Sequence, residues 1–557
     1  MESPVNGEGK HAYSGRWVAR LRGKIIAQGG TPGQARRSAQ SRFKETPEII
    51  FMPNDFPLNL PPLLDPVRTA LRGRSAYLVG GAVRDALLNR PVHDLDFALD
   101  RDGIKTARLV ANTLSRAGTG TITKADFYAL DPERDTGRVI VPQEGGAPIC
   151  MDFVAFRGAD LEADLLGRDF TVNAIALDVH TNEIHDPLGG ALDLKEKRLR
   201  LCAPSACADD PVRILRGVRL AADFGFHILP EARAAMKEAA PRLANISPER
   251  LRDELFRILD GREPSACMRA LDLLGALERI LPELAALKGL DQPAPHVHDG
   301  WAHTLAVLSH LDGILSALGP QYDPDKAADL LNGLLVLRIG RYREQLAAHF
   351  AEALTPNRSP RGLLFLAALY HDAAKPKTRQ TDEEGQLRFW DHDQQGAEMA
   401  GARARTLALS NDEIQRLETI VRNHMRILFH INRLVKDGKP PSRRAVYRFF
   451  RDTGVSGVDV CLLALADMRA TYEQSLPQEA WAACLDVVRT LLENWFEKPG
   501  ESVAPPPLVD GDDLMRELNL QPGKKIGELL EAIREAQAMG EVSTREAALE
   551  LARSKLG

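Results

Sequence analysis

The stretch that most constrains the fold of this chain is residues 77–100, where a glycine turn precedes a pair of carboxylates. We expect an apolar strand to run into Gly80 and Gly81, a short amphipathic helix to follow, and a second strand to carry Asp94 and Asp96. Side chains two residues apart on a strand point to the same face of a sheet. Both carboxylates should therefore aim at one point in an α/β unit.

The residue types in this stretch favour a metal ion beside a phosphate. Two carboxylates side by side suit Mg²⁺, and the glycines let the backbone approach a ligand closely. The helix that they open offers free N–H groups to a phosphate. A Gly-Gly turn or an Asp-x-Asp pair alone is more often structural. In this order, however, they favour nucleotidyl transfer, which needs a metal beside phosphates.

Length and composition bound the organisation of the chain. A chain of 557 residues should hold several domains, because single cores rarely exceed roughly 250–300 residues. With a net charge of −5, a nucleic-acid partner would have to be held by local basic surfaces. The sequence has no long apolar run, no signal peptide and no C-x-x-C pair. We therefore expect a cytoplasmic protein with reduced thiols and no membrane contact.

The first residues of the chain are basic. Residues 10–44 contain many Lys and Arg residues and no acidic residue. Alternating patterns at 16–21 and 24–27 predict two short strands, and Thr31 precedes a predicted helix. Residues 1–55 should therefore form a small basic module, followed by a Pro-rich linker. Its role is open between an RNA contact and a solvated charged face.

Five motifs occur in an order that a known family shares. They are Gly80-Gly81-x-Val83-Arg84-Asp85 with Asp94-x-Asp96, residues 164–174, residues 186–190, Asp209-Asp210-x-x-Arg213 and residues 247–255. This set resembles the class II tRNA nucleotidyltransferases and bacterial poly(A) polymerases. The resemblance implies an α/β head with a mixed sheet and a mostly helical neck and body. Residues 186–190 are similar to the flexible hinge between head and neck.

The resemblance also implies roles for individual residues. Asp94 and Asp96 would be the catalytic residues and would bind two Mg²⁺ ions, which activate the RNA 3′-hydroxyl and neutralise the triphosphate. Asp210 and Arg213 would form hydrogen bonds to the Watson–Crick edge of the incoming base. The implied nucleotide-binding residues are Gly80, Gly81, Arg84, Arg168, Asp169, Asn173, Asp210, Arg213 and Arg216.

Some of these residues have a structural alternative. For Arg84 and Arg168, a salt bridge within the protein competes with a contact to the triphosphate or ribose. A buried pair of Arg168 with Asp169 would also explain why both charges occur in a mixed polar and apolar segment.

Two departures from the family pattern bear on nucleotide choice. The family commonly has Arg where this chain has Gly167, and Glu where it has Asp209. The first departure removes a cation near the nucleotide. The second shortens a carboxylate, which could change how Arg213 is held and hence the choice between CTP and ATP.

A second group of candidate site residues lies between residues 296 and 475. It consists of His303, His371, Asp372, His392, His424 and Asp467. The group resembles the HD phosphohydrolase domain, which implies one or two divalent transition metals that activate water for phosphoester hydrolysis. Lys375 could face a substrate phosphate. A degenerate domain kept for packing or RNA binding is the alternative.

The end of the chain has its own helical pattern. Residues 506–557 resemble the C-terminal tail of HD-containing tRNA nucleotidyltransferases, which implies a grip on tRNA. A helical cap on the HD domain is the alternative. The expected division is 1–55 (basic module), 56–180 (nucleotidyltransferase head), 181–290 (helical neck and body), 291–475 (HD domain), 476–505 (helix and linker) and 506–557 (tail).

The function implied by the resemblance is addition of CCA to tRNA 3′ ends from CTP and ATP, without a nucleic-acid template, with HD phosphohydrolase activity beside it. Poly(A) polymerase activity, or addition of CC alone or A alone, is the alternative within the family. The alternative class is an HD phosphodiesterase or phosphatase that acts on RNA ends. The sequence does not indicate an oligomeric state.

Overall fold

The computed structural model divides into two compact units, Met1–Arg242 and Leu243–Gly557. The residues that it describes are 14–52, 58, 60–92, 94–117, 124–143, 146–321, 323–327, 329–355 and 358–556, without the side chains of 146, 147, 326 and 327. Residues 1–13 of the expected basic module and 53–57 of the expected linker lie outside the described residues. The division into six segments is finer than these two units and stays a prediction.

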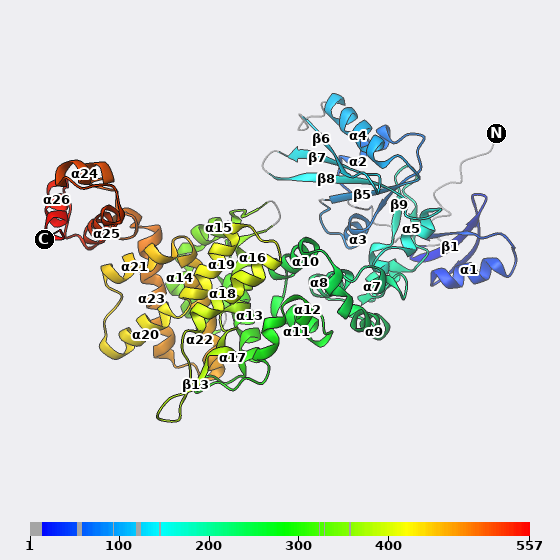
Figure 1. Ribbon diagram of the computed structural model, residues 1–557. Helices are drawn as coiled ribbons and strands as arrows, with labels where there is room; N and C mark the ends of the chain where they lie inside the picture. The colour runs from blue at the N-terminus through cyan, green and yellow to red at the C-terminus, as the bar shows by residue number, and fades with distance from the viewer. Residues whose placement is uncertain are drawn as a thin grey trace. The chain divides into compact units, whose positions relative to one another are not determined.

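The first unit is built on a mixed sheet of ten strands (Figure 1). The strands lie in the order β2-β1-β3-β10-β9-β4-β5-β8-β7-β6. Their bounds are β1 (Arg16–Leu21), β2 (Lys24–Gly29), β3 (Glu48–Met52), β4 (Ala76–Val79), β5 (Asp94–Leu99), β6 (Asp126–Asp131), β7 (Thr136–Gln143), β8 (Gly146–Ala155), β9 (Ala176–Asp178) and β10 (Ile184–His185). Strands β5 and β8 run parallel, whereas β4 runs antiparallel to β5. The predicted mixed-sheet head is confirmed.

The first unit also contains nine α-helices in its described residues, some between the strands of the sheet and others after the last strand. Their bounds are α1 (Pro32–Gln40), α2 (Leu64–Ala70), α3 (Gly81–Leu87), α4 (Gly103–Ala117), α5 (Leu161–Leu166), α6 (Gly190–Lys195), α7 (Ala206–Asp209), α8 (Arg213–Phe224) and α9 (Pro230–Ala239). Helix α4 packs on β6, β7 and β8 because Ala107, Val110, Ala111 and Leu114 form one buried apolar face at helical spacing. A short parallel pair, β11 (Arg198–Leu199) and β12 (His227–Ile228), follows.

The basic N-terminal residues form the two strands and the helix that the sequence predicts, and they join the head. Strand β3 pairs with β1 on one side and with β10 on the other. The Trp17 indole N–H donates to the Asp186 carbonyl at 3.1 Å and to its carboxylate at 3.0 Å. The same carboxylate accepts from the backbone N–H groups of Gly190 and Ala191. The module is therefore tied to the segment expected to be the hinge.

The Trp17 contact gives a prediction about stability. Burial raises the pKa of Asp186 to about 6, although the three N–H donors favour its ionised form. Trp17→Phe removes one donor to this carboxylate, so the variant should lose roughly 2 kcal/mol of unfolding free energy of the first unit at about pH 8. The loss should be smaller at about pH 5, because the carboxyl of the folded protein is then mostly protonated.

Urea unfolding followed by circular dichroism at both pH values would measure this difference. The sign follows from the hydrogen bond: removing a donor to the charged form raises the pKa of Asp186 further, and that penalty grows as the pH passes the folded value. An equal loss at the two pH values would mean that the substitution acts only through packing.

The second unit is almost entirely helical, as predicted. Its helices are α10 (Pro248–Asp260), α11 (Pro264–Leu273), α12 (Leu277–Ile280), α13 (Gly300–Ala317), α14 (Leu330–Ile339), α15 (Arg343–Ala351), α16 (Pro360–Tyr370), α17 (Lys375–Thr378), α18 (His392–Thr406), α19 (Asn411–Asn423), α20 (Arg426–Asp437), α21 (Arg443–Thr453), α22 (Ser456–Tyr472), α23 (Gln478–Phe496), α24 (Gly511–Leu518), α25 (Lys524–Met539) and α26 (Arg545–Ser554). A hairpin of β13 (Arg379–Thr381) and β14 (Leu387–Phe389) interrupts them. No helix in the described ranges is long and apolar enough to cross a membrane.

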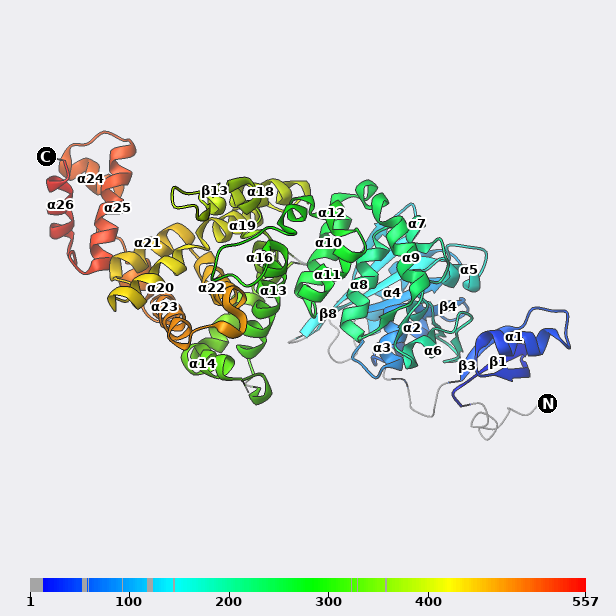
Figure 2. The same ribbon diagram turned by 90° about the horizontal axis from the view of Figure 1, so that it is seen from below.

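The last three helices form a small bundle with its own core, grouped beside α21 (Figure 2). Leu514, Ile526 and Leu529 are among the buried residues of this core. Its contacts with α21 are mainly polar: the Tyr447 hydroxyl donates to Glu531, at 3.2 Å from each of its carboxylate oxygens. Arg451 also donates to Glu531, at 3.2 Å.

Candidate active sites

The first candidate site lies at the start of β5. Leu95 and Phe97 point into the core, where the Phe97 ring stacks on Phe153 of β8 with the centroids 4.7 Å apart. Asp94 and Asp96 occupy the alternate positions of the strand and therefore share the opposite face, as predicted. Asp94 is exposed and Asp96 is partly buried.

A third carboxylate that sequence reasoning missed lies beside this pair. Asp152 of β8 is opposite Asp96 in the parallel register, and Arg138 of β7 donates two hydrogen bonds of 2.7 Å to it. Burial and the Asp152 carboxylate raise the pKa of Asp96 to about 6, and Asp94 adds to the rise. Negative charge thus gathers around Asp96, and a divalent cation bound there would offset it.

Gly80 lets the turn approach these carboxylates. Its φ is +73°, and a Cβ added to it would lie 3.3 Å from Oδ2 of Asp96 and 3.5 Å from Nη1 of Arg168. The Arg168 guanidinium donates through Nε and Nη2 to Asp164, at 3.1 and 2.9 Å. Arg168 is therefore in a salt bridge within the protein, while its Nη1 lies at the carboxylate site. The sequence offered Asp169 as the partner of Arg168 in this salt bridge, but the partner is Asp164.

Asp169 is instead the buried centre of a neighbouring network. It accepts from the amide of Asn173 at 3.1 Å and from Arg216 at 3.1 Å. Although burial alone would raise the pKa of Asp169, the Arg216 guanidinium and these hydrogen bonds hold it below its ordinary value. Arg84 donates to Asn173 at 2.7 Å and twice to Asp85 at 2.9 Å. These contacts fit the structural interpretation of Arg84.

Arg213 is the first residue of α8, and its side chain binds the segment that contains Arg168. It donates to the backbone carbonyls of Gly167 at 2.8 Å, Arg168 at 3.0 Å and Ala206 at 3.4 Å. Asp209 accepts from the Ser205 hydroxyl at 2.9 Å. In the described residues, carbonyl groups thus hold Arg213, and an effect of the shorter Asp209 carboxylate on nucleotide choice stays a prediction.

The second unit gathers all six predicted HD residues. They form two groups of three potential ligand atoms, and the atoms of each group lie within 4.8 Å of one another: His303, His371 and Asp467 in the first group, and Asp372, His392 and His424 in the second. Helix α16 explains the central position of two of them. It is buried from Gly362 to Tyr370, as an apolar helix should be, and ends directly before His371 and Asp372.

The histidine rings are oriented by backbone hydrogen bonds. Nδ1 of His371, His392 and His424 lies 2.8, 2.7 and 2.6 Å from the carbonyl oxygen three residues earlier in the chain. A ring that donates through Nδ1 presents a neutral Nε2, which is the form that binds a metal. Burial and the neighbouring His392 lower the pKa of His424 to about 3, which keeps this ring neutral.

The ligand atoms of the two groups lie close to one another. Oδ2 of Asp372 lies 3.2 Å from Nε2 of His371 and 3.6 Å from Nε2 of His303. Nε2 of His303 lies 3.0 Å from Oδ1 of Asp467, so these atoms converge on a common point. Imidazole and carboxylate ligands that converge in this way fit a divalent transition metal.

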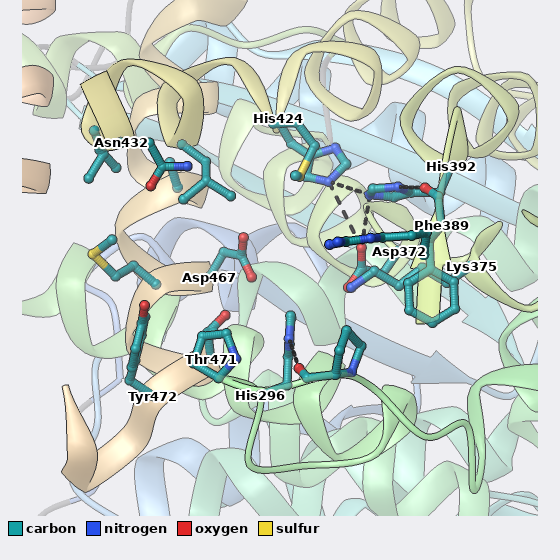
Figure 3. A pocket seen from close by; sticks show the side chains of 18 of the residues that line it. His296, Asp372, Lys375, Phe389, His392, His424, Asn432, Asp467, Thr471 and Tyr472 are labelled. Carbon is teal, nitrogen blue, oxygen red and sulfur yellow. Dashed lines mark hydrogen bonds and ion pairs between the residues drawn. The ribbon is translucent and has the colours of Figure 1, made fainter. Parts of the chain in front are cut away.

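A cavity of about 380 Å³ opens onto the second group (Figure 3). Asp372, His392 and His424 line one side of it. Lys375 also lines the cavity, with its Nζ 2.6 Å from Oδ2 of Asp372 and 2.7 Å from Oε1 of Gln292. The predicted lysine therefore lies beside a carboxylate of the second group, and its contact with a phosphate stays a prediction.

Four family models match the chain. By their descriptions they are the Poly A polymerase head domain at residues 76–200, the Probable RNA and SrmB-binding site of polymerase A at 225–288, the HD domain at 342–449 and the tRNA nucleotidyltransferase domain 2 putative at 505–552. His303 and Asp467 lie outside the matched HD range, although the fold brings them to its ligands. The fold, the carboxylate face of β5 and the matching family models together define the chain as a nucleotidyltransferase with an HD domain.

Two relatives match along most of the chain. The CC-adding tRNA nucleotidyltransferase of Geobacter sulfurreducens is 31% identical over 87% of this chain and 93% of its own. The A-adding tRNA nucleotidyltransferase of Deinococcus radiodurans is 32% identical over 84% of this chain and 93% of its own. The chain belongs to the tRNA nucleotidyltransferase family, as its motifs predict.

Other matches are shorter or more distant. The multifunctional CCA protein of Xanthomonas campestris pv. campestris is 42% identical over 238 residues, which are 40% of this chain and 55% of that protein. A solved CCA-adding enzyme in complex with CTP has a TM-score of 0.54 and 18% identity, over 89% of this chain and 96% of its own. This structural match supports the fold.

Proposed function

We propose that the chain adds CCA to the 3′ ends of tRNA from CTP and ATP, without a nucleic-acid template. The observation that carries this proposal is that three parts of the head lie close together. They are the strand face with Asp94 and Asp96, the turn at Gly80, and the segment with Gly167 and Arg168 that Arg213 holds. The tail at residues 505–552 matches a tRNA nucleotidyltransferase model and supports tRNA as the RNA.

The proposed chemistry assigns roles to the residues of the head. Asp94 and Asp96 would hold Mg²⁺, which supplies charge neutralisation at the α-phosphate and a more acidic 3′-hydroxyl. Asp152 adds to the raised pKa of Asp96, and two hydrogen bonds from Arg138 fix its position. Arg168 presents Nη1 beside Asp96, where it can contact a phosphate of the nucleotide.

Base selection is assigned to Asp210 and Arg213. A carboxylate and a guanidinium together offer the acceptors and donors that the cytosine or adenine edge requires. Three backbone carbonyls hold the Arg213 guanidinium in place, which favours recognition by a fixed side chain. We assign the network of Arg84, Asn173 and Asp169 to support of this surface.

The assay that tests this function uses the protein with Mg²⁺ and labelled CTP or ATP. Its substrates are tRNA that ends before CCA, tRNA that ends in CC, and an unstructured RNA. CTP incorporation followed by a single AMP supports CCA addition. Long A tracts on any RNA would make it a poly(A) polymerase. ATP use restricted to tRNA ending in CC would make it an A-adding enzyme.

A CC-adding activity is the second candidate within the family. It is favoured by the match along 93% of the Geobacter sulfurreducens CC-adding relative. The A-adding relative matches at about the same identity, 32%, so overall similarity does not separate the two. CTP incorporation without a following AMP, in the assay above, would identify a CC-adding enzyme.

Gly80 offers a test of the active-site geometry. Gly80→Ala places a Cβ 3.3 Å from Oδ2 of Asp96 and imposes a φ of +73° on alanine. Displacing the carboxylate by a few tenths of an ångström should lower the rate of nucleotide addition by about tenfold, because transfer depends on the exact position of the reacting groups. Initial rates of CMP and AMP incorporation would measure the loss.

Gly73 provides the matched control. Its φ is +78°, but a Cβ added to it would meet nothing within 4 Å. Gly73→Ala should therefore lose about 1–2 kcal/mol of stability from the positive φ and keep its activity. Gly80→Ala, at φ +73° and ψ −137°, should lose at least as much stability and should also lose activity. Equal rates in the two variants would contradict the placement of Gly80 against the metal-binding carboxylate.

A second activity, phosphoester hydrolysis by the HD groups, is favoured by the two groups of three potential ligand atoms, which lie within 4.8 Å of one another in each group. A divalent transition metal bound to these groups would supply an activated water. Lys375 stands beside Asp372 and would neutralise a substrate phosphate. We propose phosphodiester or phosphomonoester ends of RNA as the substrates, because the same chain extends RNA 3′ ends.

A further inference from the structure

One side of helix α21 carries three arginines that the functions proposed above leave without a role. Arg444, Arg448 and Arg451 recur at helical spacing and therefore lie on one side of the helix. The opposite side is buried, for example at Val446 and Phe450. At the helical rise, the three arginines extend over about 10 Å of the helix axis. We call these three residues the arginine stripe.

The tail covers the arginine stripe with two glutamates of α25, which lies beside α21 in Figure 2. Nε of Arg444 and Nη2 of Arg448 lie 3.2 and 2.8 Å from the same oxygen, Oε1 of Glu535. Nη1 of Arg451 lies 3.2 Å from Oε1 of Glu531. Three guanidinium groups thus face two carboxylates of the tail.

This contact is held mainly by charge. The apolar core of the tail lies within the tail, and among the described residues no side chain of α21 belongs to it. The side chains of Arg444 and Arg448 stay 52% and 50% exposed. Ion pairs that are so exposed contribute little to stability, and salt screens them. A polyanion can therefore compete with the glutamates for the arginine stripe.

Positive charge also precedes α21 along the chain. Arg433 and Lys436 of α20 and Lys439 of the following loop are exposed. Their charged groups pair with no carboxylate in the part of the chain that the structure describes. Such cations suit a chain of phosphates, because each phosphate that they neutralise releases bound counterions.

We propose that the arginine stripe binds the phosphate backbone of RNA, and that Glu531 and Glu535 cover it until RNA displaces them. Carboxylate and phosphate oxygens accept the same hydrogen bonds from guanidinium groups, so the two glutamates occupy the positions of phosphates. A strand of RNA presents phosphates in a row, as the stripe presents arginines. The proposal rests on the action on tRNA proposed above, and it adds a binding surface and a displacement of the tail.

Binding of labelled tRNA that ends before CCA tests this surface on the full chain, without nucleotides. Fluorescence anisotropy at several KCl concentrations gives the dissociation constant and its salt dependence. Arg444→Gln with Arg448→Gln should weaken binding about tenfold and reduce the slope of log Kd against log salt by about 1.5, because two phosphate contacts are lost. Arg451 is left in place because it also pairs with Asp452 of its own helix.

Removal of the two glutamate charges should have the opposite effect. Glu531→Gln with Glu535→Gln uncovers the arginine stripe and should tighten tRNA binding about fivefold. If the arginines only held the tail in place, both pairs of substitutions would loosen the same contact and would shift the affinity in the same direction. Shifts in the same direction, or no shift in either double variant, would overturn the proposal.

Arg405→Gln and Glu418→Gln are the matched controls. These residues form an exposed ion pair of 3.0 Å between α18 and α19 of the same unit, and the Arg405 side chain is 61% exposed. Neither substitution should change tRNA binding. A change as large as that of the stripe variants would mean that any exposed charge has this effect, which would contradict a specific surface.

The proposed function and the arginine stripe can fail separately. A wild-type protein that binds tRNA and shows the opposite shifts, but adds no nucleotide, would contradict CCA addition and support the stripe. Wild-type addition of CCA with unchanged affinity in all variants would contradict the stripe alone. Absence of tRNA binding by the wild type would contradict both.

Discussion

Replacing Asp96 with asparagine should reduce nucleotide addition by at least about a thousandfold. A bound metal contributes several kcal/mol to a phosphoryl-transfer transition state, and each 1.36 kcal/mol is a factor of ten in rate. Asp96 lies two residues after Asp94 on β5 and opposite Asp152 on the adjacent strand β8. Its replacement therefore removes the carboxylate that is nearest to both of the others. Initial rates of CMP and AMP incorporation into tRNA, measured over a range of Mg²⁺ concentrations, would determine the effect.

Asp100→Asn is the matched control for this experiment. Asp100 directly follows the last residue of β5, at the other end from Asp94, and is exposed. The same change from carboxylate to amide should leave nucleotide addition unchanged there. Hydrolysis by the HD groups should be intact in both variants. An Asp96→Asn enzyme with wild-type rates at saturating Mg²⁺ would remove this carboxylate from the proposed mechanism.

The second large effect is expected at the HD groups. Changing His371 and Asp372 together to alanine removes one ligand from each of the two groups. We expect hydrolysis of RNA ends to fall by at least about a thousandfold, and the bound transition metal to be lost. Metal analysis of the purified protein and hydrolysis of a 2′,3′-cyclic phosphate would measure the two outcomes, and nucleotide addition should be unchanged.

His349→Ala is a control for the loss of a buried histidine. His349 is buried in the same unit, lies 2.9 Å from Oδ1 of Asp459 and belongs to neither ligand group. This variant should lose stability without losing metal. If either the His371 and Asp372 pair or the Asp94 and Asp96 pair abolished both activities, the two sites could not be independent.

Sequence reasoning was most successful where neighbouring residues carry the signal. The Gly80 turn and the alternation of Asp94 and Asp96 along β5 are local, because strand geometry alone decides which side chains share a face. These features placed the carboxylate face of the head before any tertiary contact was known.

The residues that were missed depend on register between distant segments. Asp152 joins Asp96 only because β5 and β8 pair in parallel with these two residues opposite each other. No local pattern around residue 152 marks it as part of a site. Helix α4 and the strands β6 and β7 separate β5 from β8 along the chain, so the sequence does not indicate which later strand pairs with β5.

Hydrogen bonds from side chains to backbone carbonyl groups could not be predicted from the sequence either. The sequence suggested only that the shorter Asp209 carboxylate could change how Arg213 is held. It did not indicate the carbonyl groups of Gly167, Arg168 and Ala206 that hold this arginine. Every residue has a carbonyl group, and thus composition gives no indication of which one an arginine will use. The HD residues were found through their order along the chain, but their division into two groups is a tertiary result.

The pairing of β3 with β10 has a consequence for how the protein can be shortened. Strand β10 is only Ile184–His185, and β3 covers its side away from β9. A chain that starts after Met52 would expose these backbone groups as a new edge of the sheet, which can pair with another molecule. Removal of the basic N-terminal residues would therefore promote aggregation, and a loss of RNA binding in such a shortened chain would not show that these residues contact RNA.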